Sequence, residues 1–185
     1  SSAPTRTRET TMAATHTAAF LGVTFGNNKS MAAIFNGAGS GKVLRIYRIW
    51  VLNNQTGAVT GVLTTWELRR STVQSSGTAV TPVKHDTSSS NLAAQIAVAT
   101  GATVTSVQAD CFRKWMWSND EPAVSSGTSD EFETLVPLNC IWDADPSSTS
   151  NVEPIVLREG FGIDMRHTGS SAVGVVDIMI EFTET

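Results

Sequence analysis

Short apolar runs whose side chains alternate between two faces, separated by polar turns, constrain this chain more than any other feature. In residues 172–184, AVGVVDIMIEFTE, every second residue from Gly174 to Phe182 falls on one face, and that face is expected to cover a core. Residues 42–53, KVLRIYRIWVLN, alternate in the same way, and one of their faces is expected to be apolar. Roughly eight to ten such runs, with no long amphipathic helix, predict an all-β chain.

The connections between the first runs predict two pairings. Residues 18–26 and 30–35 flank a turn-prone Gly-Asn-Asn, so they are predicted to form a hairpin. Residues 42–53 lead through the turn NNQTG into residues 58–72, and these two runs are expected to pair antiparallel. The length of the second run and its internal Gly61 indicate a bent or bulged strand.

Later segments complete the expected strands. Residues 110–118 alternate, whereas residues 134–142 contain Pro137 and are expected to form an edge strand or to carry a bulge. Residues 90–100 fit a short helix and a strand equally well, and the sequence leaves both open. Further strands are predicted at 154–158, 161–167 and 172–184, and polar surface loops between the strands.

Length and composition fit a single domain. The chain has 185 residues, 41% of them hydrophobic and 16% charged, which is enough apolar material for one buried core. We expect an antiparallel β-sandwich of jelly-roll-like topology over residues 18–185. Residues 1–17 are rich in Ser, Thr and Ala without either periodicity, so they are predicted to form an extended arm.

Charge is distributed unevenly along the chain. Residues 1–93 contain nine Lys and Arg against three Asp and Glu, a net charge of +6, and residues 94–185 contain four against fourteen, a net charge of −10. Either strands of the two halves interleave and neutralise each other, or opposite patches meet between neighbouring subunits. The overall acidic excess argues against nucleic-acid binding.

The motifs that suggest catalysis do not meet its chemical requirements. NGAGSGKV at 36–43 is similar to a phosphate-binding loop, but its glycine spacing is one residue short and a strand follows it, so a flexible hairpin loop is expected. His16, His85 and His167 have no His or Cys companions at ligand spacing and are interpreted as surface residues. No Gly-x-Ser-x-Gly elbow presents a nucleophile, so we expect no enzyme, and no cofactor.

Metal, redox and membrane functions also find little support. Asp143 and Asp145, with the acidic residues of SDEFE at 129–133, offer oxygen ligands for Ca²⁺, but not at the spacing of a twelve-residue calcium loop, so solvated loop charges are favoured. Cys111 and Cys140 match no metal or redox motif; we expect reduced core thiols and intracellular assembly. Neither a membrane-spanning run nor a signal peptide is recognised, so a soluble protein is expected.

Five tryptophans allow two interpretations: they fill the core and subunit contacts, or they form an exposed platform for stacking sugar rings. The first is favoured. Trp115 and Trp117 project from the same face of one predicted strand, so they are the pair to test for a ligand or an interface.

The segment NVEPIVLREGFGIDMRHTGSSAVGVVDIMIEFTE, residues 151–184, resembles the closing strands of small β-sandwich structural proteins of tailed bacteriophages. In these proteins a P-[IL]-V-L-[RK]-x-G-x-G run precedes a final strand ending in aromatic-Thr-Glu. The resemblance implies a virion component assembled in the host cytoplasm: a head decoration, or cement, protein, or a piece of the neck or tail. It supplies no catalytic residue.

The expected function is therefore assembly. The resemblance implies a homo-oligomer, a trimer by analogy with jelly-roll phage proteins, bound to the major capsid protein or another virion protein. We expect the arm, with Arg6 and Arg8, to reach an adjacent subunit or the shell. The alternative is a glycan-binding sandwich of a tail fibre or adhesin, which requires exposed tryptophan.

Overall fold

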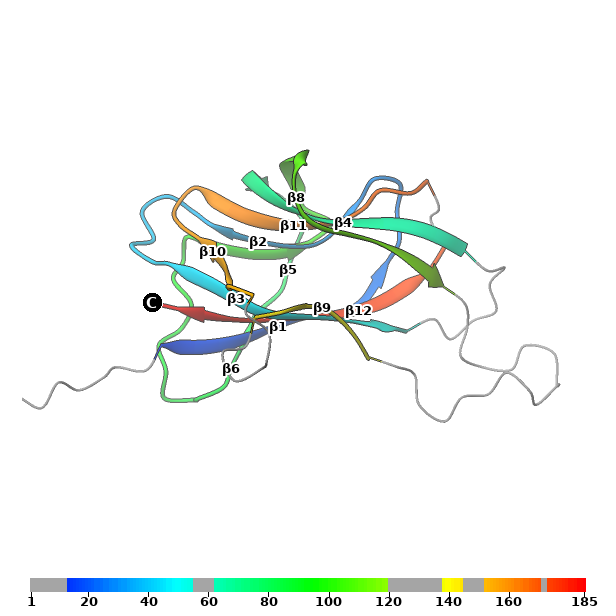
Figure 1. Cartoon of the computed structure of the whole chain (residues 1–185). Helices are drawn as coiled ribbons and strands as arrows, with labels where there is room; N and C mark the ends of the chain where they lie inside the picture. Colours follow the sequence, from blue (N-terminus) through cyan, green and yellow to red (C-terminus); the bar gives the residue numbers. More distant parts are fainter. Residues whose placement is uncertain (1–12, 55–61, 120–137, 145–151, 171–172) are drawn as a thin grey trace, which may run out of the picture.

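A computed structural model of the chain describes residues 13–54, 62–119, 138–144, 152–170 and 173–185. These residues form two antiparallel sheets packed face to face, with no helix among them, so none of them forms a helix that could cross a membrane (Figure 1). The predicted all-β, antiparallel sandwich is confirmed.

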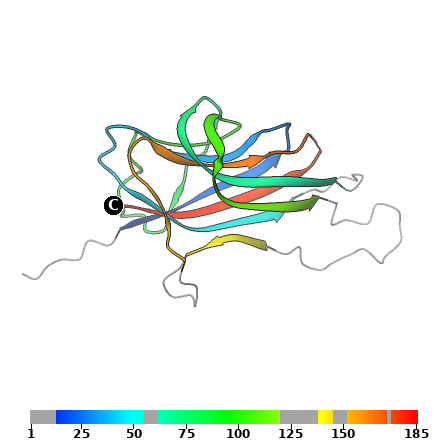
Figure 2. The same cartoon turned by 45° about the horizontal axis from the view of Figure 1, so that its top comes forward.

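The first sheet is built around the last strand of the chain. Its order is β10-β3-β12-β1-β6, and β9 also pairs with β3. Its strands are β1 (Ala14–Thr24), β3 (Leu44–Asn53), β6 (Val83–Lys84), β9 (Leu138–Asp143), β10 (Ile155–Leu157) and β12 (Val175–Glu184). Figure 2 shows β9, in yellow, at an edge of this sheet, as expected for an edge strand, and residues 134–137 of the predicted strand lie outside the described residues.

The second sheet has the order β5-β7-β2-β11-β4-β8. Its strands are β2 (Ser30–Asn36), β4 (Val62–Ser75), β5 (Thr78–Ala79), β7 (Ile96–Thr100), β8 (Thr103–Asn119) and β11 (Phe161–His167). The ambiguous segment 90–100 therefore contains a strand, and β8 continues well beyond the predicted run 110–118.

The core lies between the sheets, as the alternation of β12 predicts. Val176, Ile178, Ile180 and Phe182 are all fully buried, and each packs in the same apolar cluster as Trp66 of the opposite sheet. At roughly 1.5–3 kcal/mol for each large apolar side chain removed from water, this face is the main source of stability for β12.

The strand β3 departs from simple alternation. Leu44 and Ile46 are buried, but further along the strand the buried residues are Ile49 and Val51. The register with β12 shifts between Ile46 and Arg48, which leaves Tyr47 as an extra residue, a β-bulge. The bulge exchanges the two faces of the strand, so the prediction of one apolar face through residues 42–53 is wrong.

Both pairings predicted from short turns are wrong. β1 and β2 lie in different sheets, so the Gly-Asn-Asn turn crosses the sandwich and does not close a hairpin. β3 and β4 are likewise in different sheets, and β4 pairs with β11 and β8. Period-2 alternation shows which face is buried, but it does not show which strand lies alongside. The predicted irregularity of this second run is present, because its register with β8 shifts three times; Gly61 lies outside the described residues.

Part of the predicted arm belongs to a strand, and ion pairs join the two oppositely charged halves of the chain. Residues 14–17, assigned to the arm, are the first residues of β1 and pair with β12; residues 1–12, with Arg6 and Arg8, lie outside the described residues. The two oppositely charged halves interleave. Lys42 pairs with Glu184 at 3.2 Å, and Arg48 lies 3.5 Å from Glu181 and 3.6 Å from Asp143.

Candidate functional site: a charged cluster on the outer face of a sheet

Four charged side chains lie on the face of β4 and β11 that points away from the core. Trp66, Leu68, Ile163 and Met165 alternate with them and face inward. On the outer face, Glu67 of β4 lies opposite Arg166 of β11, and Arg69 lies opposite Asp164. Signs therefore alternate both along each strand and across the pair. We call these four residues, together with Lys114 of β8, the charged cluster.

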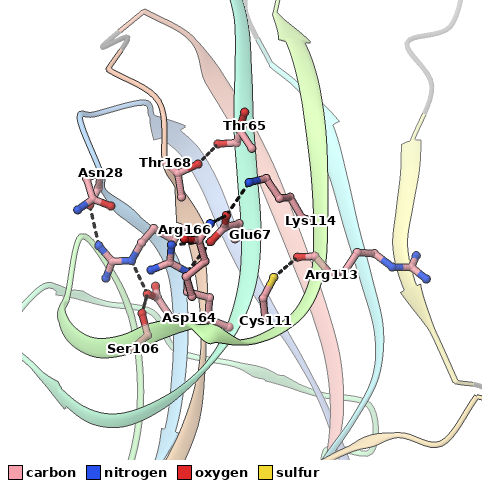
Figure 3. Close-up of polar contacts among 12 residues, drawn as sticks. Asn28, Thr65, Glu67, Ser106, Cys111, Arg113, Lys114, Asp164, Arg166 and Thr168 are labelled. Carbon is pink, nitrogen blue, oxygen red and sulfur yellow. Dashed lines mark hydrogen bonds and ion pairs between the residues drawn. The ribbon is translucent and has the colours of Figure 1, made fainter.

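Ion pairs run mainly along the strands. Glu67 Oε2 accepts a hydrogen bond from Arg69 Nε at 2.7 Å, and Asp164 Oδ2 accepts one from Arg166 Nε at 2.7 Å. Lys114 Nζ, from the neighbouring strand, lies 3.1 Å from Glu67 Oε1 (Figure 3). Each carboxylate has at least one cation within direct contact, as a buried charge requires.

Both carboxylates are buried although they face outward. Glu67 is 1% exposed and Asp164 is 0% exposed. The cover comes from β8, where Ser106 Oγ donates to Asp164 Oδ2 at 2.8 Å and Gln108 Nε2 donates to Glu67 Oε1 at 2.8 Å. The register between β4 and β8 jumps here, from Cys111 to Ser106. The irregular stretch of β8 is thus held against the charged cluster.

Electrostatics keep the Glu67 carboxyl ionised. Burial by itself raises its pKa, but hydrogen bonds from Arg69, Lys114 and Gln108 and the charge of Arg69 outweigh burial, so the pKa lies below its usual value. A carboxylate held in this form is a poor general acid or base near neutral pH. The contacts from Ser106, Gln108 and Lys114 hold β8 against the charged cluster, an arrangement that fits a structural clamp.

His167 is buried on the core side of β11, so its interpretation as a surface residue is wrong. Its Nδ1 lies 2.7 Å from the carbonyl oxygen of Gly26, and its Nε2 is hydrogen-bonded to Thr64 Oγ1. Because a carbonyl can only accept, Nδ1 carries the proton and Nε2 accepts from the Thr64 hydroxyl. Burial lowers the pKa of His167.

His16 is also buried, at 1% exposed, and stacks on Phe182 with ring centroids 5.5 Å apart. Burial lowers its pKa, although Glu184 acts in the opposite direction. Only His85 is exposed as predicted, and its Nε2 lies 2.7 Å from Thr17 Oγ1. Among the described residues, no three His, Cys, Asp or Glu side chains are grouped to hold a metal ion.

The glycine-rich loop at residues 37–41 holds a carboxylate of the protein itself, that of Glu159. The backbone N–H groups of Gly39 and Gly41 donate to the two carboxylate oxygens of Glu159 at 3.2 and 2.6 Å. Both glycines have positive φ, which points their amides toward one side. The loop connects β2 to β3 across the sandwich, so it is not the expected hairpin loop.

The tryptophans singled out for testing lie in and against the core. Trp117 is 8% exposed, and Trp115 is partly buried and stacks on Trp66 with centroids 6.0 Å apart. They do not form the exposed platform that the glycan alternative requires.

The prediction of core thiols is wrong, because Cys111 is only partly buried and Cys140 is exposed. The two cysteines form no disulfide with each other. Asp143 pairs with Arg48, whereas Asp145 and residues 129–133 lie outside the described residues.

Two large apolar side chains are exposed beyond the charged cluster on the same face. Leu63 of β4 is 67% exposed and Met116 of β8 is 63% exposed. Met116 pairs with Thr65, so Leu63 and Met116 occupy diagonal positions on adjacent strands. On the opposite face the ribbon is backed by Trp66 and Trp117. We call Leu63 and Met116 the apolar patch.

Comparisons of the chain with protein-family models, with curated proteins and with solved structures find no match.

Proposed function

We propose that this protein is a non-enzymatic structural subunit that functions by binding other protein surfaces, and that it decorates the head of a tailed bacteriophage. The setting rests on the resemblance of residues 151–184 to closing strands of phage structural proteins. The mode of action rests on the surface. The bound partner would be the major capsid protein, and the chain would act as an oligomer, for which a trimer is the expected state.

The apolar patch is the observation that carries the binding role. Leu63 and Met116 expose apolar area on a two-stranded ribbon whose other face is packed against the core. Large apolar side chains on a rigid surface are typical of protein contact sites, and methionine is enriched there. The charges of the charged cluster beside the patch are paired with one another, which is consistent with a role in supporting this surface.

Imaging of virions from the phage that encodes the chain tests the setting. An antibody against the purified protein is expected to label the heads of these particles, with matching density on the capsid lattice. Virions whose heads lack the chain would contradict the decoration role, and labelling confined to neck or tail would reassign it.

Variants of the patch test the contact. In particles assembled with Leu63→Ser and Met116→Ser together, we expect about a tenfold loss of incorporated protein, which corresponds to a combined loss of about 1.4 kcal/mol from the two side chains. Leu21→Ser is the matched control, because Leu21 is exposed to 70% on the other sheet. Equal incorporation of both variants would exclude the patch as the contact.

A further inference from the structure

A polar pocket of about 380 Å³ lies where three segments meet: the turn at residues 26–30, residues 101–104, and Arg166 near the end of β11. Neither residue of the apolar patch lines it, and it shares Arg166 with the charged cluster. We call it the basic pocket, because both of its charged lining residues, Lys29 and Arg166, are cations.

Lys29 has no counter-ion in the described part of the chain. Its Nζ donates to the carbonyl oxygen of Thr24 at 2.6 Å and lies 3.3 Å from Thr24 Oγ1, and both partners are neutral. No described carboxylate lies within ion-pair distance of it. Burial lowers the pKa of Lys29 because nothing offsets the loss of water around the ammonium. A partly desolvated cation of this kind is stabilised by any anion that can reach it.

Arg166 has donor capacity left. Its Nε donates to Asp164 and its Nη1 donates to Asn28 O at 2.7 Å (Figure 3). Its Nη2 lies 3.5 Å from Val104 O. A guanidinium carries five N–H groups, so two remain after these three contacts. Asp164 neutralises Arg166 in charge, which leaves Lys29 as the net positive charge of the pocket.

Ser30 is the independent sign of an absent partner. Ser30 is one of the residues that line the pocket and is 3% exposed, and its Oγ has no hydrogen-bond partner in the described part of the chain. A buried hydroxyl without a partner is destabilising, so in native structures such a group is usually completed by a ligand, an ion or water. A hydroxyl donor beside two cations has the character of an oxyanion site.

We propose that the basic pocket binds a single oxyanion group, a phosphate or a carboxylate, with Lys29 as its counter-ion and Arg166 and Ser30 as hydrogen-bond donors. The chemistry is shared by free inorganic phosphate and by an acidic side chain of a bound peptide. The inference does not depend on the proposed function, because it concerns the isolated chain and none of the residues of the apolar patch.

Titration of the ¹⁵N-labelled full chain with sodium phosphate tests this, at pH 7 and at ionic strength held constant with sodium chloride. Amide shifts that saturate are expected at residues 26–30 and 101–104. A parallel titration with triglutamate separates the sources: saturation by phosphate alone indicates a phosphate ligand, and saturation by the peptide alone indicates a protein carboxylate. Saturation by neither up to about 10 mM, a binding free energy of roughly −3 kcal/mol, would overturn the proposal.

Matched variants make the assignment specific. Lys29→Met is expected to weaken binding about tenfold, and Ser30→Ala severalfold with the charge unchanged. Lys84→Met is the control, since Lys84 Nζ also donates to a backbone carbonyl, Ser89 O at 2.8 Å, but lines no part of the pocket. Equal affinities of the Lys29→Met and Lys84→Met variants would also overturn the proposal. If Lys29→Met fails to fold, Ser30→Ala against Lys84→Met decides.

Discussion

Asp164 and Arg69 lie directly opposite each other across β4 and β11, yet Asp164 takes its closest ion pair from Arg166 on its own strand. Glu67 does the same with Arg69. Each of these four residues therefore has an oppositely charged residue on its own strand and another on the neighbouring strand. The arrangement makes each charge costly to remove, because deletion leaves its neighbours buried and uncompensated.

Glu67→Gln is expected to lower the free energy of unfolding by about 3 kcal/mol, because Arg69 and Lys114 then lose their shared carboxylate. Urea unfolding measures this. Lys114→Gln is the control and should cost at most about 1 kcal/mol, since the Lys114 side chain is 56% exposed and its pair is screened by water. Similar losses in the two variants would contradict the burial argument.

Stability is expected to fall on acidification in two steps. His16 and His167 have pKa values lowered from 6.5, so below about pH 6.5 the unfolded chain binds more protons than the native one. The free energy of unfolding therefore declines as the pH falls from 6.5 to the pKa values of these histidines in the folded protein. The Glu67 pKa is lowered from 4.5, so its contribution is present above that pH and is lost as pH falls through the folded value.

A histidine variant tests the first of these two steps. His167→Gln removes a titrating group, so the decline in the urea midpoint between pH 7 and pH 5 should be shallower than in the wild type, although the variant is less stable throughout. Midpoints are measured at fixed ionic strength. An unchanged slope would mean that His167 does not bind its proton on unfolding.

Gly162→Ala is expected to destabilise the second sheet by roughly 2–3 kcal/mol, as overpacking does. An added Cβ would overlap the carbonyl oxygen of Ile34 and come within 2.6 Å of Ser71 Oγ. β11 would have to move away from both of its neighbours. Thermal unfolding measures the loss; a variant with wild-type stability would show that these strands separate more easily than the packing indicates.

Glu159→Ala should release the amides of Gly39 and Gly41, which donate to its carboxylate. Hydrogen exchange of these two amides is expected to accelerate about tenfold or more, because a bond to a charged acceptor contributes roughly 1.5–3 kcal/mol. Amides inside β12 serve as the internal reference and should not change. Acceleration across the whole chain would instead indicate global destabilisation.

Sequence periodicity predicted the class of fold and the buried face of β12, because both depend on residues adjacent in the chain. It failed at Tyr47, where one extra residue exchanges the faces of β3. The charged cluster also escaped prediction. Acid and base stand two apart in WELRR and in DMR, so each pair shares a face, but outward charges on strands are usually solvated.

Burial of that cluster depends on contacts distant in sequence. Ser106 covers Asp164, a residue 58 positions away, and no local pattern indicates that a strand will be held over its own sheet. The buried histidines were missed for the same reason, since His167 is enclosed by Thr64 and Gly26 from two other segments. The basic pocket likewise joins three segments that lie far apart along the chain.

The two last strands each occupy an interior position: β11 between β2 and β4, and β12 between β3 and β1. Until β11 and β12 have formed, the four strands that flank them therefore each keep an unpaired edge. A prematurely terminated product would be two open half-sheets, prone to aggregate, and not a smaller stable domain. The closure of both sheets therefore depends on β11 and β12, which come after all of their neighbours in the chain.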